Sequence, residues 1–140
     1  MAAGFSAGQL AEAGSIATEA QALRARVAPL GQADAVAYAA VLAALHRSKD
    51  DLGRAEAVRT ALSEAADVPL AVAEAGVRVG VLAERLERDG NPNLRGDAAT
   101  ARLLAAAAVR AAATLVELNL RAGADSRVGR ARELADEARF

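Results

Sequence analysis

The sequence predicts an all-α protein, a bundle of long, kinked, antiparallel helices that associates as a dimer. Hydrophobic residues make up 54% of the chain and aromatic residues only 2%, and alanine is the commonest apolar residue. Alanine has the highest helix propensity, but its side chain buries little area. Apolar positions recur at steps of three and four, and the alternation typical of strands is missing. We therefore expect long helices with thin apolar faces that need a second copy to complete a core.

Length and charge narrow the possible functions. The 140 residues fit a single helical domain, residues 1–140. The 17 basic and 18 acidic residues give a net charge of −1, which argues against nucleic-acid binding. The chain has no cysteine and one histidine, His46, so disulfides, thiolate metal sites and multi-histidine metal sites within one chain are excluded. We expect no metal site.

No segment resembles a signal peptide or a membrane span. The N-terminus lacks a basic stretch followed by an apolar run. The apolar stretch 98–120 is interrupted by Arg102, Arg110 and Glu117, which makes it too polar to span a bilayer. The sequence therefore predicts a cytoplasmic protein that does not contact membranes.

Four helical regions follow one another along the chain. The first, 7–47, is interrupted by Pro29 and Gly31, but its apolar face keeps phase across them, so we expect one kinked helix. The second, 52–88, should bend at Pro69, and the breaker cluster 89–93 predicts a turn. The third runs from 96 to 120, and a short polar helix follows at 126–138. Three apolar faces are expected: Leu23, Val27, Leu30, Asp34, Tyr38, Val41 and Leu45; Val58, Leu62, Ala65, Val68, Val72 and Ala75; and Leu104, Ala108, Ala111, Leu115 and Leu118.

Asp34 is the only carboxylate on the first apolar face. A buried carboxylate is costly unless it is paired, hydrogen-bonded or protonated, and burial would raise its pKa toward the range useful for acid–base work. Alternatively, Asp34 could be the N-cap of a helix that starts after the break at Pro29 and Gly31. The pattern favours neither reading over the other. Tyr38 is expected in the core or in an interface.

Polar residues also cluster around the third helix. Asn91, Asn93 and Asp97 lie at its start and could present amides and a carboxylate to a polar ligand. The turn itself and the positive end of the helix also favour these residue types, and we weight this structural reading more strongly. Asn119, beside the apolar face, could bind a ligand or a neighbouring helix, and the second reading is preferred.

Three stretches together resemble the cyclodeaminase/cyclohydrolase family of folate enzymes. Residues 33–38, Ala-Asp-Ala-Val-Ala-Tyr, are similar to the family's Asp-Ala-Glu-Ala-Phe. Val68-Pro69-Leu70 resembles the proline bend of the family's long second helix. The most specific stretch is Gly-Asn-Pro-Asn-Leu at 90–94, followed by Asp97 and an alanine-rich helix that ends in Leu-Asn-Leu at 118–120.

This resemblance implies an all-α dimer that acts on the one-carbon bridge of reduced folates. The family includes cyclodeaminases, which close formimino-tetrahydrofolate and release ammonia, and cyclohydrolases, which open methenyl-tetrahydrofolate with water. By resemblance, Asp34 is the acid–base carboxylate, while Asn93, Asp97 and Asn119 contact or support the substrate. No prosthetic group is implied, since the tetrahydrofolate derivative is the substrate.

By this resemblance, we expect the chain to be N-terminally short relative to the family. The family opens with a helix and a Pro-Gly-Gly-Gly-Ser loop, whereas residues 1–6 resemble the helix that follows the loop. The family's glutamate two residues after the acid–base carboxylate is Val36 in this chain. Two hypotheses follow: a folate cyclodeaminase or cyclohydrolase, and a shortened, non-catalytic relative that serves as a helical oligomerisation protein.

Overall fold

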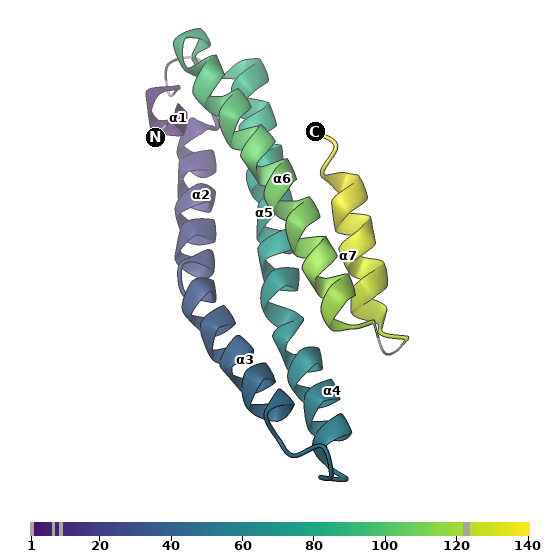
Figure 1. The fold of residues 1–140 in the computed structure, drawn as a ribbon. Helices are drawn as coiled ribbons and strands as arrows, with labels where there is room; N and C mark the ends of the chain where they lie inside the picture. Colours follow the sequence, from purple (N-terminus) through teal and green to yellow (C-terminus); the bar gives the residue numbers. More distant parts are fainter. Residues whose placement is uncertain (1, 7, 9, 122–123) are drawn as a thin grey trace.

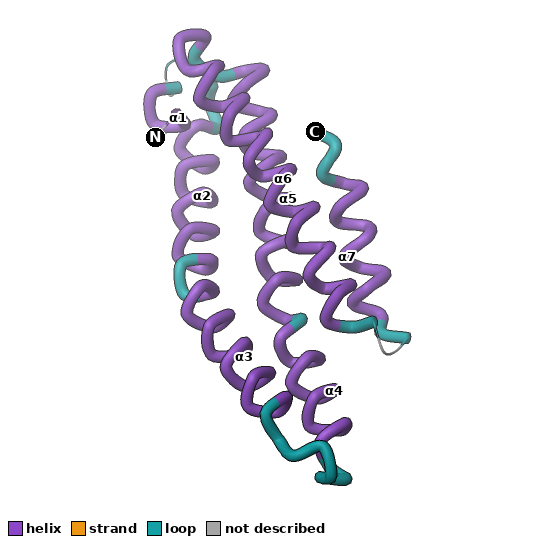
Figure 2. The backbone as a smooth tube through the Cα atoms, viewed as in Figure 1, coloured by secondary structure: helices purple, strands orange, loops and turns teal. Residues whose placement is uncertain are grey.

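The fold is all-helical over the residues that the computed structural model describes, which are 2–6, 8, 10–121 and 124–140. Helices α2 and α3 lie end to end beside α4 and α5, which also follow one another, and α6 and α7 lie on the other side (Figure 1). Short loops and turns connect the helices (Figure 2). The predicted all-α class is therefore confirmed. The helices are α1 (Ala2–Phe5), α2 (Ala13–Val27), α3 (Leu30–Leu45), α4 (Arg54–Ala65), α5 (Asp67–Asp89), the 3₁₀ helix η1 (Pro92–Leu94), α6 (Arg95–Asn119) and α7 (Ser126–Glu137).

The first helical region is a kinked helix, as predicted, but it runs from Ala13 to Leu45 rather than over 7–47, since residues 10–12 lie outside any helix. Ala28 and Pro29 between α2 and α3 keep right-handed helical dihedral angles. The N–H of Ala28 donates to the carbonyl of Arg24 at 3.0 Å, and the N–H of Ala33 donates to the carbonyl of Pro29 at 3.1 Å. Because proline lacks an N–H and its ring displaces the preceding turn, the helix bends there without ending.

The second region bends as well, slightly before the proline. Helix α4 ends at Ala65 and α5 begins at Asp67, with Ala66 between them in helical geometry. Pro69 lies in the first turn of α5 and is buried. A proline ring clashes with the carbonyl four residues earlier, which here belongs to Ala65, the last residue of α4. The steric cause therefore lies at Pro69, and the bend appears one turn upstream.

Helices α5 and α6 form the centre of the molecule, and they approach closely because their contact residues are small. Ala73 and Val109 are fully buried between them. A Cβ added to Gly76 would lie only 2.6 Å from Cγ2 of Val109, which shows that glycine is needed for this approach. Helix α7 closes the same core with Leu134, which is 1% exposed.

The predicted apolar face of the third helix points away from this core. Leu104 is 66% exposed and Leu115 is 51% exposed. The buried face of α6 consists instead of alanines and valines on the opposite side of the helix. Close packing against α5 favours these small residues and leaves the leucines outside. The buried residues of α6 are Ala98, Ala105, Ala106, Val109, Ala112, Ala113 and Val116.

Helices α2 and α3 are attached to the rest of the chain mainly at their two ends. At one end, Ile16 packs in a cluster with α1 and α5, and at the other, Val41 and Ala44 pack against α4. Ion pairs with α5 support the middle, for example Glu19 with Arg78 at 2.5 Å. Consequently part of the first predicted apolar face stays outside the core of the single chain.

Two helical stretches of the described chain could cross a membrane by length and composition alone, Ala13–Leu45 and Pro92–Asn119. The second stretch meets this criterion although we expected its charges to make it too polar to span a bilayer. Core helices of soluble proteins and signal sequences near the N-terminus meet the same criterion. The charges that interrupt the second stretch, such as Arg102 and Glu117, are paired with α5 and α7. The absence of a membrane contact therefore remains a prediction.

Candidate functional site

A mostly apolar cavity of about 400 Å³ lies between α2, α5 and α6, next to α1. Its volume falls within the range of small-molecule sites, roughly 300–1,000 Å³. Side chains of α5 form its inner wall, with α2 and α6 on either side. The residues around it are Ala2, Ala3, Ile16, Ala17, Ala20, Gln21, Arg24, Val79, Leu82, Ala83, Leu86, Asp97, Ala98 and Ala101.

Three polar side chains, from Gln21, Arg24 and Asp97, stand on the walls of this cavity. Asp97 lies in the first turn of α6, where the positive end of the helix dipole favours a carboxylate. Gln21 and Arg24 lie on the facing helix α2, and Arg24 is in its last turn. The cavity thus offers an apolar inner wall, a carboxylate on one side, and an amide and a guanidinium on the other. Such an arrangement suits a flat ligand with polar edges.

The sequence analysis identified Asp97 but missed Gln21 and Arg24. Both belong to a helix whose clearest signal was its apolar face, and arginines are scattered along the whole chain. Gln21 follows Ala17 by four positions and Arg24 follows Gln21 by three, and residues at such steps lie on one side of a helix. This spacing could have indicated that the three residues share a face.

Asn91 and Asn93 form the turn at the same end of the molecule. The side-chain oxygen of Asn91 accepts a hydrogen bond from the backbone N–H of Asn93 at 3.0 Å. The backbone N–H of Asn91 donates to Oγ of Ser6 at 2.9 Å, and its side-chain amide donates to the carbonyl of Phe5 at 3.3 Å. Asn91 therefore has a structural role, whereas the side chain of Asn93 is exposed, four residues before Asp97.

Asp34 lies in the interior of α3 and is exposed in the single chain. The N-cap interpretation is wrong, because α3 begins at Leu30 with Pro29 as its N-cap. Asp34 is not buried either, because the buried residues of α3 are Val41 and Ala44, which pack against α4. Tyr38, expected in the core or an interface, is 62% exposed. Asp34 follows the cavity residue Arg24 by ten positions, or about 15 Å along a helix, and lies outside the cavity.

Asn119 is the last residue of α6 and is half-buried. It follows Asp97 by 22 positions, so the two lie about 33 Å apart along one helix. Within one chain, only Asn93 and Asp97 of the four candidate residues lie at the same end. Asp34 and Asn119 each lie elsewhere.

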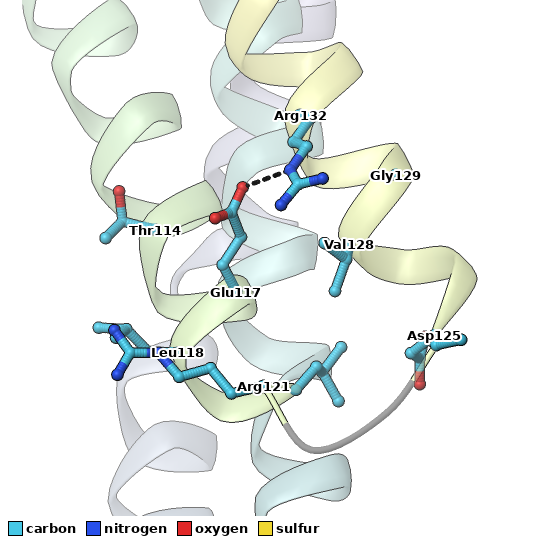
Figure 3. A pocket seen from close by; sticks show the side chains of 10 residues that line it. Thr114, Glu117, Leu118, Arg121, Asp125, Val128, Gly129 and Arg132 are labelled. Atoms are coloured by element: carbon cyan, nitrogen blue, oxygen red, sulfur yellow. Dashed lines mark hydrogen bonds and ion pairs between the residues drawn. The ribbon is translucent and has the colours of Figure 1, made fainter.

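A second hollow, of about 540 Å³, lies between the end of α6 and the start of α7 (Figure 3). Glu117 crosses it to meet Nε of Arg132 at 2.8 Å, and this hydrogen bond lowers the pKa of Glu117 below its ordinary value. Asp125 caps α7 by accepting the N–H of Arg127 at 2.9 Å. The Arg127 side chain and this N–H lower the pKa of Asp125 to about 2. These charges pair with one another, which indicates a helix junction rather than a ligand site.

In the part of the chain that the structure describes, no group of three or more His, Asp or Glu side chains is placed to hold a metal ion. The polar groups on the cavity wall are the carboxylate of Asp97, the amide of Gln21 and the guanidinium of Arg24. These groups can bind a polar ring, stabilise a cation and transfer protons.

Comparison with known families gives one match, which covers nearly the whole chain. The family model for formiminotransferase-cyclodeaminase matches residues 3–138. No curated protein matches the chain. The matched range includes the cavity, the turn at 90–94 and α7.

Proposed function

We propose that this chain, which belongs to the formiminotransferase-cyclodeaminase family, binds a reduced folate and acts on its one-carbon bridge as a homodimer of antiparallel helical bundles. The reaction is either the closure of formimino-tetrahydrofolate or the opening of methenyl-tetrahydrofolate by water. The observation that carries the proposal is the cavity between α2, α5 and α6, with Asp97 on one wall.

The cavity matches the chemistry of a reduced folate. The fused ring of a folate has apolar faces and an edge of N–H donors next to a carbonyl acceptor. The apolar side chains of α5 suit the faces, and the carboxylate of Asp97 can accept from the N–H groups. The guanidinium of Arg24 suits an anionic group of the ligand, because arginine binds carboxylates with two parallel hydrogen bonds.

Both reactions require proton transfer at a cationic, amidine-like carbon. In the hydrolysis, water adds to this carbon, and its proton reaches the nitrogen that leaves as the ring opens. In the deamination, the second folate nitrogen attacks the formimino carbon, and its proton reaches the departing ammonia. A carboxylate can stabilise the cation and carry the proton. By family resemblance we assign this role to Asp34, and the binding role to Asn93, Asp97 and Asn119. Because Asp34 lies outside the cavity of its own chain, this assignment requires the Asp34 carboxylate of a second copy to reach the ligand.

The test follows the absorbance of methenyl-tetrahydrofolate and, in parallel, its equilibrium binding. We expect Asp34→Asn to lower the rate by about a hundredfold or more while binding persists, since acid–base catalysis contributes on that order. We expect Asp97→Asn to weaken binding by roughly tenfold, because hydrogen bonds to a charged group are worth about 1.5–3 kcal/mol.

Asp50→Asn is the matched control, because Asp50 is an exposed carboxylate between α3 and α4, outside the cavity. This variant should retain the wild-type rate and affinity. A folded, dimeric chain with no rate above the spontaneous reaction would refute the enzymatic proposal.

The exposed leucines of α6 favour a second candidate function, that of a non-catalytic oligomerisation protein. Contiguous exposed apolar patches on a helix usually mark protein contacts. This candidate predicts stable dimers by sedimentation, without folate binding or turnover. Measuring the dimer and the folate affinity on the same preparation separates the two functions.

A further inference from the structure

An uncharged apolar face runs along the outside of α6. We call it the α6 leucine face, and its residues Leu104, Ala108, Ala111, Leu115 and Leu118 are all exposed. Their spacing of four, three, four and three is that of the contact seam of a two-helix coiled coil. Helices with this spacing are expected to pack against another helix along this seam.

The charged residues in the same part of α6 point to other helices of the same chain. Nε of Arg102 pairs with Glu87 of α5 at 2.6 Å. Arg110 donates to the carbonyl of Ala138 at 3.3 Å, and Glu117 pairs with Arg132 of α7. Because these three charged side chains point elsewhere, the α6 leucine face carries no charge from Leu104 to Leu118. Such a face favours an apolar partner over water.

We infer that this partner is the same face of a second copy, packed antiparallel about a twofold axis. The order of side-chain sizes around the centre of the face, Leu-Ala-Ala-Leu, reads the same in both directions. In an antiparallel pair centred between Ala108 and Ala111, Leu104 lies opposite the partner's Leu115. The alanines then meet at the centre, where their small size allows close approach. A twofold contact requires such self-complementarity.

The charges at the two ends of the face select the antiparallel direction. Asp97 precedes it and Arg121 follows it. In the register just described, the partner's α6 ends at Asn119, about one turn from the level of Asp97, and Arg121 follows that end, so that opposite charges lie near one another at both ends. A parallel pair would place Asp97 beside the partner's Asp97. The helix dipoles also favour the antiparallel arrangement.

This pairing brings the partner's Asn119 to the cavity. Within one chain, Asp97 and Asn119 are separated by about 33 Å along α6, but in the antiparallel register the partner's Asn119 lies within about 5 Å of the level of Asp97. Each cavity would then combine a carboxylate of one chain with an amide of the other. This step rests on the proposed function: the carboxylate accepts the ring N–H groups of the folate, and the amide donates to the neighbouring ring carbonyl.

Cysteine crosslinking tests the register directly, because the chain contains no cysteine of its own. Two copies of Ala108→Cys should form a disulfide, since their Cα atoms would be about 5–6 Å apart, within disulfide range. Leu104→Cys alone should not, because its two copies would be separated by roughly 16 Å along the axis. A mixture of Leu104→Cys and Leu115→Cys should crosslink.

Three results would overturn the inference. Crosslinking of Leu104→Cys with itself would indicate a parallel pair. A monomer by sedimentation, with no crosslink at Ala108→Cys, would exclude this interface. A monomer that binds phospholipid vesicles through the α6 leucine face would assign the face to lipid.

Mixed dimers test the shared site. Asp97→Ala and Asn119→Ala should each weaken folate binding about tenfold or more as homodimers, so that few of their sites fill at a folate concentration near the wild-type Kd. After the two variants are mixed and exchanged, half of the dimers contain one chain of each, and each mixed dimer keeps one intact site, so about a quarter of the wild-type folate sites should return. Crosslinking without folate binding by the wild type would refute the proposed function alone, whereas wild-type binding without recovery in the mixture would refute the shared site alone.

Discussion

The contact between Gly76 and Val109 allows a quantitative test of how the central helices pack. In Gly76→Ala, the added Cβ would lie 2.6 Å from Cγ2 of Val109, a side chain that is completely buried. Overpacking of this kind costs about 1–3 kcal/mol. The gain in helix propensity from glycine to alanine offsets about 1 kcal/mol of this cost. We therefore expect the free energy of unfolding to fall by about 1 kcal/mol.

Gly129→Ala is the matched control. Gly129 lies in α7, where a Cβ would meet no atom within 4 Å, so the substitution should stabilise the protein by about 0.5–1 kcal/mol through helix propensity. The assay is urea unfolding monitored by circular dichroism. Val109→Ala should relieve the clash, so the double variant with Gly76→Ala should be more stable than the sum of the two single changes implies. If Gly76→Ala stabilised the protein as much as Gly129→Ala, our account of the α5–α6 contact would be wrong.

Three further predictions concern α7 and the attachment of α2. Leu134→Ala should lower the free energy of unfolding by about 2–5 kcal/mol in the same assay, because Leu134 is 1% exposed at the centre of the core. The pKa of Asp125 is lowered to about 2 from an ordinary value of 3.8, so its stabilising effect is full above about pH 4 and is lost as the pH falls toward 2. Asp125→Asn should flatten this part of the stability–pH curve, and an unchanged curve would contradict the role of the bond to Arg127. Arg78→Ala should cost no more than about 1 kcal/mol, with less effect at high salt, because its ion pair with Glu19 is exposed; a larger loss would show that this pair does more than support the middle of α2.

Local chemistry made the helices and their bends predictable from the sequence. Alanine-rich segments have few alternatives to helix, and prolines interrupt them at fixed places. The kink at Pro29 and the turn at 89–93 follow from these rules. The bend near Pro69 differs by one turn, since the ring of a proline acts on the carbonyl four residues before it.

The buried faces of the helices were harder to predict. Periodicity identified the α6 leucine face, but it could not tell whether this face packs within the chain or outside it. Which face of α6 is buried within the chain depends on Gly76, whose missing side chain lets α5 approach the small residues of α6. Similarly, the phase of the first apolar face could not show that α2 and α3 are attached mainly at their ends, which leaves Asp34 exposed.

The length of α6 connects the two functional hypotheses. A helix of 25 residues is about 37 Å long, so it separates polar groups at its two ends too widely for one small ligand to contact both. A site that uses both ends of this helix therefore needs two copies running in opposite directions. Oligomerisation through the α6 leucine face would then be a condition for folate binding at Asp97 rather than an alternative to it. It follows that a charge placed at the centre of this face, as in Ala111→Glu, should abolish the dimer and folate binding together, and a monomer that still bound folate with wild-type affinity would separate the two functions.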